Sequence, residues 1–414
     1  MVVKRGVRGS TQDDVRRHNL GTLLTEVHRH GQRSRAQLTA EMGLNRSTIG
    51  DLVAELTAAG LVLERASVAR GRAGRPSLMV TPRADGAYVL GVDLGVRHLT
   101  VGRIGLGGEL LERVEVPSRG DWSALDVTVE TVAGTAHRLR AAAPAGARCV
   151  GVGLSVPGVI RHEDGLLRFA PNLGWVDLPL GGELSNRLAL PVVVGNDADL
   201  AALAEHWRGV AAGFEHVIVM SGEIGVGGGI IVDGRPLRGR GGYAGEIGHL
   251  RVNPEGRRCR CGSWGCLETE IGVEALLLAA GRPPETGIAG FREVIAAAAV
   301  GDPDARRSAE RVAGWLGAAT GMLVNTFNPD IVVYCGPLGE LFTVAEECVQ
   351  RACDEASLVA PREQVRLAAS AFGTDTQLVG AAEAAFGPLL EDPIGLLAGL
   401  TAPLTGRRRF QNGI

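Results

Sequence analysis

Four side chains in the middle of the chain could bind a metal ion. They are His249, Cys259, Cys261 and Cys266. Three thiolates and one imidazole make the closed tetrahedral ligand set of a structural zinc site, with no position left open for water. The spacing is not that of a zinc finger, and the alternative is that the cysteines are reduced and unligated. We predict a zinc site that orders this loop and positions the neighbouring Glu246 and Glu268.

A second chemical feature is the pair Asn196-Asp197, which follows an apolar strand predicted at residues 192–194. A carboxylate at the end of a buried strand could take the proton from a hydroxyl group of a bound substrate. Taken alone, such a pair is more often simply solvated at the surface. The sequence therefore marks this strand end as a candidate substrate site.

A third group of residues could contact DNA. Three of them, Arg46, Ser47 and Thr48, open a predicted helix, and three arginines lie in an Arg/Gly loop at residues 69–76. The three loop residues are Arg70, Arg72 and Arg75. The first turn of a recognition helix faces base edges in the major groove, and arginines on a thin glycine-rich backbone can contact phosphates or enter a narrow minor groove.

The elements around these residues predict a winged helix-turn-helix over residues 1–85. Leucines and valines at helical spacing predict a first helix that ends at Gly31. Ser34 and Gln37 form a capping-box pattern for a second helix, Gly43 supplies the turn, and Asn45 caps the third helix. Strands at 61–65 and 77–80 enclose the Arg/Gly loop as a wing. The alternative is that these helices only pack against a neighbouring domain.

Charge is distributed unevenly along the 414 residues. Residues 1–83 hold 14 lysines and arginines against 7 aspartates and glutamates, whereas the rest of the chain holds 29 against 39. Only the N-terminal part is therefore electrostatically suited to nucleic acid. No uncharged apolar run is long enough to cross a membrane, and the first residues lack the apolar core of a signal peptide, so we expect a cytoplasmic protein with no membrane partner.

From residue 87 onward, apolar strands alternate with glycine turns and helices, which is typical of α/β architecture. The seven cysteines are odd in number and unevenly spaced, which argues for metal binding over a disulfide framework. Apart from the cluster at 259–266, they stand alone in apolar or helical surroundings, where we expect small buried side chains.

The body of the chain resembles the ROK family of repressors, open reading frames and kinases over roughly residues 88–388. The resemblance rests on the glycine run 225–229, the sequence Gly-Glu-Ile-Gly-His at 245–249 and the cysteine block 259–268. The winged helix, with its Gly-Arg-Pro at 74–76, resembles that of the repressor branch. This similarity implies a two-lobed actin-like ATPase fold, with lobes at about 86–200 and 201–388.

The resemblance also implies roles for single residues. The family's catalytic base corresponds to Asp197, and its zinc ligands correspond to the four residues named above. The positions matching the family's sugar contacts are Asn172, Asn196, Asp197, Glu246, His249 and Glu268. Carboxylates and amides that form paired hydrogen bonds are what a polyol requires. The family's Asn-Asp-Ala-Asn reads Asn-Asp-Ala-Asp here, with Asp199 in the last place.

Both phosphate-binding loops depart from the family pattern. The first normally reads Asp-x-Gly-Gly-Thr-Lys and is Asp-Leu-Gly-Val-Arg-His at 93–98, with Arg97 as a substitute positive charge. The second has Glu223-Ile224 in place of Gly-Thr, which removes a hydroxyl and adds a negative charge. Phosphoryl transfer depends on positioning and charge neutralisation, so we expect a domain that keeps its sugar pocket and zinc without efficient use of ATP.

We therefore predict a transcriptional repressor of carbohydrate genes whose DNA binding changes with a hexose, pentose or derivative. Sugar would close the lobes and shift the two winged helices of a homodimer, or dimer of dimers, relative to operator half-sites one helical turn apart. One alternative is an active glucokinase-like enzyme with an added DNA-binding domain. Another is a constitutive DNA-binding protein whose body only dimerises. Residues 389–414 are predicted to form a loose tail.

Overall fold

Local capping signals set the ends of the N-terminal helices, as the sequence predicts. The computed structural model describes residues 11–66, 78–117, 122, 124–222 and 224–401. Its first helices are α1 (Gln12–His30), α2 (Arg35–Met42) and α3 (Arg46–Ala58). Ser34 and Gln37 form the capping box of α2, and Gly43 ends that helix in the left-handed conformation. The Asn45 side chain caps α3.

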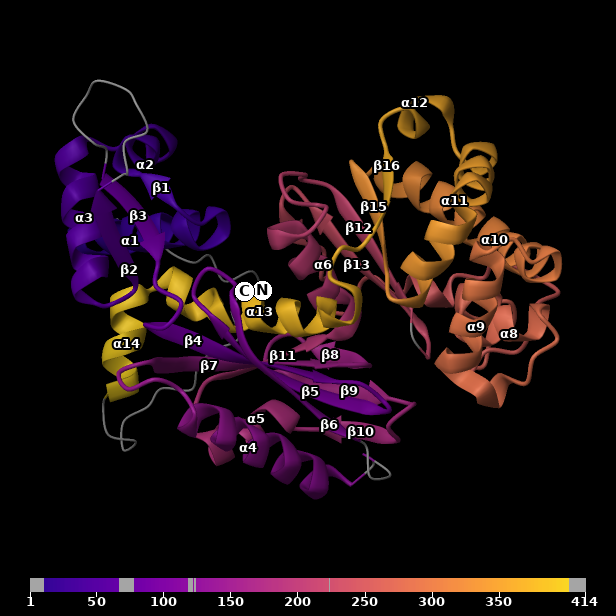
Figure 1. Ribbon diagram of the computed structural model, residues 1–414, viewed down its shortest axis with the longest axis horizontal. Helices are drawn as coiled ribbons and strands as arrows, with labels where there is room; N and C mark the ends of the chain where they lie inside the picture. The colour runs from indigo at the N-terminus through magenta and orange to yellow at the C-terminus, as the bar shows by residue number, and fades with distance from the viewer. Residues whose placement is uncertain (1–10, 67–77, 118–121, 123, 223, 402–414) are drawn as a thin grey trace, which may run out of the picture.

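A small sheet completes this part of the molecule (Figure 1). Its strand order is β1-β3-β2, with β1 (Arg33–Ser34), β2 (Val62–Ala66) and β3 (Leu78–Pro82). The antiparallel pair β2–β3 is the base of the predicted wing. The wing loop itself, with Arg70, Arg72 and Arg75, lies outside the described residues.

The first lobe of the body is built on a five-stranded sheet in the order β11-β7-β4-β5-β6. Its strands are β4 (Ala87–Leu94), β5 (His98–Gly105), β6 (Leu110–Pro117), β7 (Arg148–Val156) and β11 (Val192–Asn196). The helices α4 (Leu125–Ala141) and α5 (Leu180–Leu188) pack beside it, and a small sheet of β8 (Val159–Arg161), β9 (Leu166–Ala170) and β10 (Trp175–Leu178) extends it.

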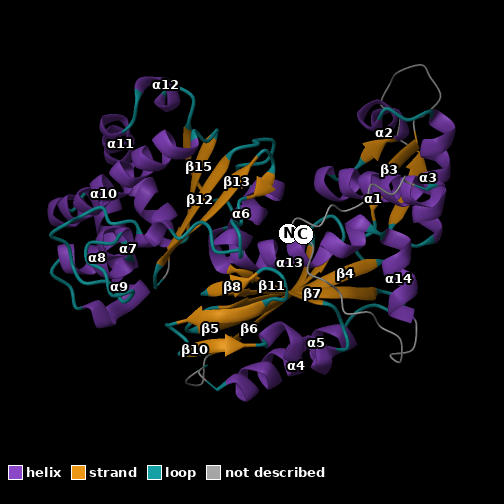
Figure 2. Cartoon of the chain, turned by 180° about the vertical axis from the view of Figure 1, so that it is seen from behind, coloured by secondary structure: helices purple, strands orange, loops and turns teal. Residues whose placement is uncertain are grey.

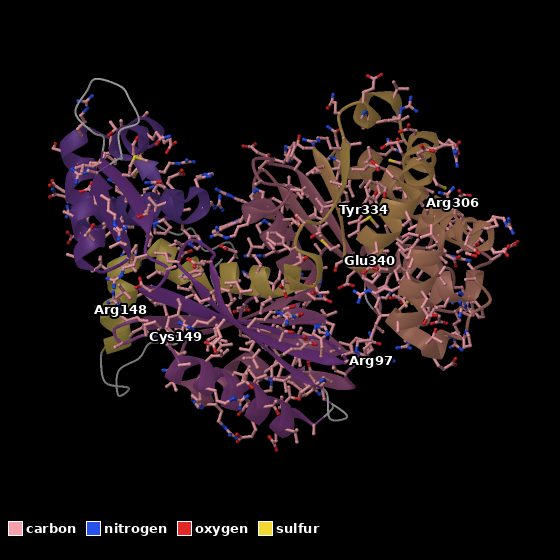
Figure 3. The ribbon with its side chains drawn as sticks, viewed as in Figure 1. Arg97, Arg148, Cys149, Arg306, Tyr334 and Glu340 are labelled. Atoms are coloured by element: carbon pink, nitrogen blue, oxygen red, sulfur yellow. The ribbon has the colours of Figure 1, made fainter. Side chains whose placement is uncertain are left out.

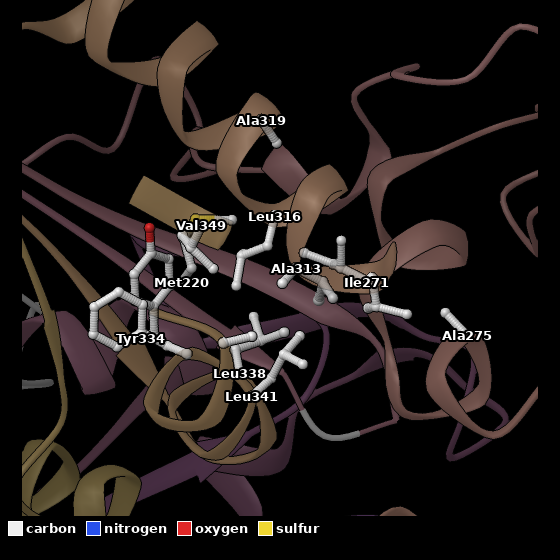
Figure 4. Packing of buried hydrophobic residues seen from close by; sticks show 14 of the residues in the cluster. Met220, Ile271, Ala275, Ala313, Leu316, Ala319, Tyr334, Leu338, Leu341 and Val349 are labelled. Carbon is white, nitrogen blue, oxygen red and sulfur yellow. The ribbon is translucent and has the colours of Figure 1, made fainter. Parts of the chain in front are cut away.

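The second lobe has a sheet in the order β14-β13-β12-β15-β16. Its strands are β12 (Val217–Gly222), β13 (Val226–Val232), β14 (Arg235–Pro236), β15 (Ile331–Cys335) and β16 (Arg366–Ala369). The accompanying helices are α7 (Leu267–Ile271), α8 (Val273–Ala279), α9 (Gly287–Ala299), α10 (Pro303–Phe327), α11 (Pro337–Ala356) and α12 (Val359–Arg362). Figure 4 shows Tyr334 of β15 packed among Met220, Leu316 and Leu338 in the apolar core of this lobe.

Two helices lie between the lobes and change the predicted lobe boundary. Helix α6 (Asp197–Arg208) follows β11 and packs on β12 and β13. Helix α13 (Thr376–Glu391) returns to the first lobe, where it packs on β4 and β7 as well as on α6 (Figures 1 and 2). The expectation that residues 201–388 form the second lobe is therefore wrong for α13. Strand and helix patterns do not reveal such a return, because it depends on packing between distant segments.

The prediction of a loose tail from residue 389 is also wrong for the part that the structure describes. Helix α13 continues to Glu391, and a further helix, α14 (Pro393–Thr401), packs against α1 and α13. Leu396 and Leu397 are buried there. The prolines and glycines that suggested a tail instead start and punctuate short helices. Residues 402–414 lie outside the described part of the chain.

The winged helix and the first lobe share one apolar core. Buried side chains of α1, α3 and β3 join those of β4, β7, α13 and α14 in a single cluster. Val27, Val89, Phe386 and Leu397 belong to it. The winged helix is thus packed directly onto the body. Among the described residues, no helix is long and apolar enough to cross a membrane.

Candidate functional site

The structure brings the four predicted metal ligands together. The donor atoms of His249, Cys259, Cys261 and Cys266 all lie within 4.8 Å of one another. The Sγ atoms of Cys261 and Cys266 are 3.7 Å apart, and the Sγ of Cys259 is 3.7 Å from Nδ1 of His249. Short antiparallel bridges, Arg251 with Cys266 and Arg258 with Trp264, fold the loop back so that these side chains meet.

The spacing of these donors fits a tetrahedral zinc ion. Two thiolates bound at about 2.3 Å to one tetrahedral zinc lie about 3.8 Å apart, close to the separation of Cys261 and Cys266. Burial is the main cause that raises the pKa of Cys259, and its thiol donates to Oε1 of Glu268 at 2.7 Å. Ionising a buried thiol is unfavourable, and a bound cation would stabilise the resulting thiolate. The donor set is therefore one that zinc can occupy.

His249 connects the metal cluster to a second group of polar residues. It ends the short 3₁₀ turn η1 (Ile247–His249), and its Nδ1 faces both Cys259 and Glu268, the latter at 3.7 Å. Its Nε2 points the other way, 4.0 Å from Glu246. One nitrogen can thus bind a metal while the other contacts Glu246 or a ligand. The two roles predicted for His249 are compatible in this geometry.

A small polar cavity lies where β8, the start of α6, β13 and η1 meet. Its lining includes Asn196, Asp199 and Glu246, together with glycines of β13 and of the segment 242–245. Asn196 is held firmly, because its Oδ1 accepts the N–H groups of Ala198 and Asp199 while its Nδ2 donates to the Gly158 carbonyl. Two of the predicted sugar-contact residues, Asn196 and Glu246, therefore share one cavity.

Asp199 is a residue of this cavity to which the sequence analysis gave no role. Burial, and next the charge of Asp197, raise its pKa from 3.8 to about 7. The guanidinium of Arg238 acts in the opposite direction, and Glu246 adds to the rise. Arg238 also contacts Nε2 of His162 at 2.6 Å. The departure from Asn-Asp-Ala-Asn was the only sequence signal for Asp199, and none pointed to Arg238.

Three other predicted sugar contacts, Asp197, Glu268 and Asn172, are not among the residues that line this cavity. Asp197 opens α6, and its Oδ1 accepts the N–H of Ala198 at 3.0 Å. Oε2 of Glu268 lies 3.1 Å from the point where a Cβ on Gly225 would sit. Asn172 is tied to the cysteine loop, since its Oδ1 accepts from Arg260 at 2.6 Å. The structure thus places Asp197 next to the cavity residue Asn196 and ties Asn172 to the cysteine loop, and a sugar-binding role for these residues stays a prediction.

The first glycine loop is covered by a side chain of its own. Nε2 of His98 contacts Oδ2 of the buried Asp93 at 2.9 Å. The imidazole of His98 lies so close to Gly95 that a Cβ there would be 2.1 Å from the ring. The neighbouring Arg97 extends toward the second lobe, where its Nη1 lies 3.2 Å from a Cβ built on Gly287 (Figure 3).

The second glycine run has a packing role. A Cβ on Gly229 would lie 2.4 Å from the carbonyl oxygen of Ala198 in α6, and a Cβ on Gly227 would lie 2.8 Å from the Ala198 side chain. A Cβ on Gly228 would meet Ile247 of η1 at 2.5 Å. These glycines therefore allow β13 to approach α6 and η1 closely. Glu223 lies outside the described residues, and the adjacent Ile224 is exposed.

The candidate DNA-binding face centres on the first turn of α3. Arg46 and Ser47 are exposed there, and Thr48 is partly exposed. The Asn45 side chain accepts the N–H of Thr48 at 2.8 Å and the hydroxyl of Ser47 at 2.6 Å. An N-terminal helix end carries a partial positive charge, which Arg46 reinforces. The geometry suits contact with an anionic backbone.

Known proteins resemble this chain over most of its length. The sequence profile of the ROK family matches residues 89–386. A putative xylose repressor from Caldicellulosiruptor sp. (strain Rt8B.4) is 30% identical over 351 residues, which cover 79% of this chain and 86% of that protein.

Two solved structures are similar in different ways. A ROK family transcriptional regulator, described as a homolog of the E. coli MLC protein, superposes with a TM-score of 0.77 at 28% identity, covering 94% of this chain and 99% of the other. A ROK family glucokinase from Streptomyces griseus, in complex with glucose and AMPPNP, gives a TM-score of 0.62 at 30% identity. It covers 72% of this chain and 99% of its own.

Proposed function

Because this chain belongs to the ROK family, we propose that it is a sugar-responsive transcriptional repressor. One observation carries the proposal: a capped helix-turn-helix is joined, in one chain, to a body that has a polar cavity between its lobes. The similarity to a ROK transcriptional regulator spans 94% of the chain, whereas the similarity to a ROK glucokinase spans 72%. Relatives named xylose repressors support the same proposed function.

The winged helix is proposed to bind operator DNA through α3 and the wing. Arg46, Ser47 and Thr48 would enter the major groove or contact the flanking phosphates. The wing residues Arg70, Arg72 and Arg75 keep the role predicted from the sequence, although they lie outside the described residues. Two copies of the chain, in a homodimer or a dimer of dimers, would read half-sites one helical turn apart.

The cavity beside α6 is proposed to bind the sugar. Asn196, Glu246 and the Nε2 of His249 would contact its hydroxyl groups, with Asp197, Glu268 and Asn172 completing the site. The cavity has a volume of about 30 Å³, which is too small for a sugar, so the lobes would open to admit the sugar and then close on it. Sugar binding is thus expected to change the relation between the lobes.

Zinc is proposed as the structural metal of the cysteine cluster. His249, Cys259, Cys261 and Cys266 would hold it, and its chemistry there is to fix four ligands in place. His249 bound through Nδ1 keeps its Nε2 directed at Glu246. The cysteine loop would thereby hold the imidazole and Glu268 in one arrangement beside the cavity.

Efficient use of ATP is not part of the proposal. The loop at residues 93–98 lacks the family's threonine and lysine, and the imidazole of His98 covers the backbone of Gly95 where a phosphate would need to approach. The second glycine run is explained by close packing on α6. One observation favours the alternative of a sugar kinase: Asp197 remains at the start of α6, beside the cavity.

Thermal unfolding with and without sugars tests the proposal. A panel of hexoses, pentoses and N-acetylated sugars should contain at least one that raises the unfolding temperature, and Glu246→Ala should abolish this rise. The control is Glu293→Ala, which removes a glutamate from the exposed surface of α9 and should leave the rise intact. If a sugar stabilises wild type and Glu246→Ala equally, the cavity is not the sugar-binding site.

An assay of ATP-dependent phosphorylation with the same panel decides between sensor and kinase. We expect no turnover beyond the background of the buffer. Rapid sugar phosphorylation that Asp197→Asn abolishes would identify the chain as an enzyme instead.

A further inference from the structure

Helix α6 connects the cavity to the winged helix. Its first turn carries Asn196, the cap residue that lines the cavity, and its last residue is Arg208. Twelve residues at about 1.5 Å each give a length of about 18 Å. One end of this rigid element therefore lies at the cavity, and the other end lies against α1 of the winged helix.

At its far end, Arg208 enters a buried polar cluster with residues from three other elements. Its Nε contacts Glu383 of α13, its Nη1 donates to the Gly107 carbonyl at 2.9 Å, and its Nη2 donates to the His28 carbonyl at 3.1 Å. His28 belongs to the last turn of α1, and Gly107 lies in the β5–β6 turn. The guanidinium of Arg208 thus links α1 of the winged helix to α6 and α13 of the body.

The imidazole of His28 is fixed in the same cluster. Its Nδ1 accepts the N–H of Gly107 at 2.9 Å, and its Nε2 lies 2.9 Å from Oε2 of Glu383 and 2.7 Å from Nη2 of Arg208. Burial lowers the pKa of His28, which keeps the ring neutral. Burial alone would raise the pKa of Glu383, but its contacts with His28 and Arg208 outweigh that effect and lower it. His28 and Glu383 are both fully buried.

The residue before Arg208 makes a second contact with α1. The guanidinium of Arg29 lies over the ring of Trp207, 3.5 Å from its centroid. His28 packs edge-on against the same ring and in a tilted arrangement against Phe386 of α13. The last two residues of α6 therefore hold the last turn of α1 from two sides.

Close backbone contacts prevent α6 from moving alone. A Cβ on Gly380 of α13 would lie 1.9 Å from the carbonyl oxygen of Leu200, and a Cβ on Gly229 of β13 would lie 2.4 Å from that of Ala198. Helix α6 is thus clamped between a strand of the second lobe and a helix of the first. A shift of the second lobe that moves α6 must also move the cluster at its far end.

We infer that Arg208 is a positioning residue, which transmits sugar occupancy from the cavity through α6 to His28 and so sets the placement of α1 and its winged helix. This inference rests on the proposed function and adds to it the path of regulation. A buried polar cluster has few alternative arrangements, so a change in the position of Arg208 also changes the positions of its partners.

The test measures how far a sugar changes DNA affinity in the full chain. The DNA probe is a duplex selected in vitro by the sugar-free protein, and the sugar is the panel member that stabilises the wild type. Arg208→Gln combined with Glu383→Gln removes both buried charges, so that neither is left unpaired. The sugar-induced change in Kd, typically about 5- to 150-fold in allosteric proteins, should fall below about 2-fold in this variant. Sugar affinity and sugar-free DNA affinity should each stay near their wild-type values, which a merely structural loss would not allow.

Arg148→Gln is the matched control. Arg148 also donates from the body to the winged helix, at the Ala59 carbonyl, but it belongs to β7 and not to α6 (Figure 3). This variant should keep the full sugar-induced change. A double variant with undiminished coupling would overturn the inference while leaving the proposed function intact. If no sugar of the panel binds the wild type, the inference and the proposed function both fail.

Hydrogen exchange on the wild-type protein provides the second measurement. Sugar should change the exchange of backbone amides at the end of α6, in the last turn of α1 and around Glu383. Changes confined to the cavity residues would overturn the inference, even if the variants fail to fold.

Discussion

His249 is the single residue in which the metal cluster and the cavity meet. Its Nδ1 faces the thiol of Cys259, and its Nε2 faces Glu246. A ligand set that holds one nitrogen therefore also sets the direction of the other. The sequence predicted both roles of His249, because the residue types and the family motif are local in the chain.

Replacing one cysteine of the cluster tests the metal site. Cys266→Ser should lower bound zinc from about one ion per chain to a small fraction and reduce the free energy of unfolding by about 3 kcal/mol or more. Elemental analysis and urea unfolding measure the two effects. Cys348→Ser, at a cysteine outside the cluster whose thiol donates to the Glu310 carbonyl, should retain zinc. Equal metal content in the two variants would contradict the assignment.

Asp199 should make stability depend on pH. The carboxyl ionises near 3.8 in the unfolded chain and near 7 in the folded chain, where burial and Asp197 raise its pKa. Between these values the folded state binds more protons, so the contribution of Asp199 to stability falls as pH rises from about 4 to 7. Asp199→Asn, which does not titrate, should therefore gain stability relative to wild type across that range. Urea unfolding at several pH values measures the difference in the free energy of unfolding between the variant and wild type. A difference that does not change with pH would contradict the raised pKa of Asp199.

Residue-scale prediction from the sequence was limited where function depends on partners far apart in the chain. Glu383 appears in the sequence as an isolated charge in an apolar helix, whereas His28 and Arg208 stand among other polar residues near helix ends. Only the packing of α1, α6 and α13 brings them into one cluster. The same holds for Arg238, whose position beside Asp199 has no sequence signature.

At the scale of elements, helix ends were predictable and helix packing was not. The capping box of Ser34 and Gln37, the left-handed Gly43 and the Asn45 cap are all decided within four residues of the chain. The return of α13 to the first lobe and the docking of α14 on α1 depend instead on long-range burial. For the same reason, the sequence predicts a former phosphate loop at the glycines of β13 and does not reveal their close packing on α6.

The crossing of α6 and α13 gives a prediction at this scale. Gly380→Ala would place a Cβ 1.9 Å from the Leu200 carbonyl oxygen, so it should lower the free energy of unfolding by about 1–3 kcal/mol or more. Gly134→Ala, in α4 where no atom lies within 4 Å of the new Cβ, should raise it by about 0.5–1 kcal/mol. Urea unfolding of both variants compares the two. If Gly380→Ala is as stable as wild type, α6 and α13 can move apart with no loss in the free energy of unfolding.

At the scale of the whole molecule, the uneven charge and the shared core act together. The N-terminal part carries the positive charge suited to DNA, and the rest of the chain is acidic. The two parts share an apolar core through α13 and α14, so the winged helix is packed against the body and is not connected to it by a linker alone. A change between the lobes can therefore reach the DNA-binding face through packed elements.

The central claim is that this body reports a sugar to a DNA-binding domain without consuming ATP. Its most direct test is a fluorescence anisotropy titration of the selected duplex with the intact protein, with and without each sugar of the panel, followed by addition of Mg-ATP and analysis for sugar phosphate. We expect at least one sugar to change duplex affinity by about 5-fold or more and no sugar phosphate to accumulate. Duplex affinity that no sugar alters, or rapid formation of a sugar phosphate, would contradict it.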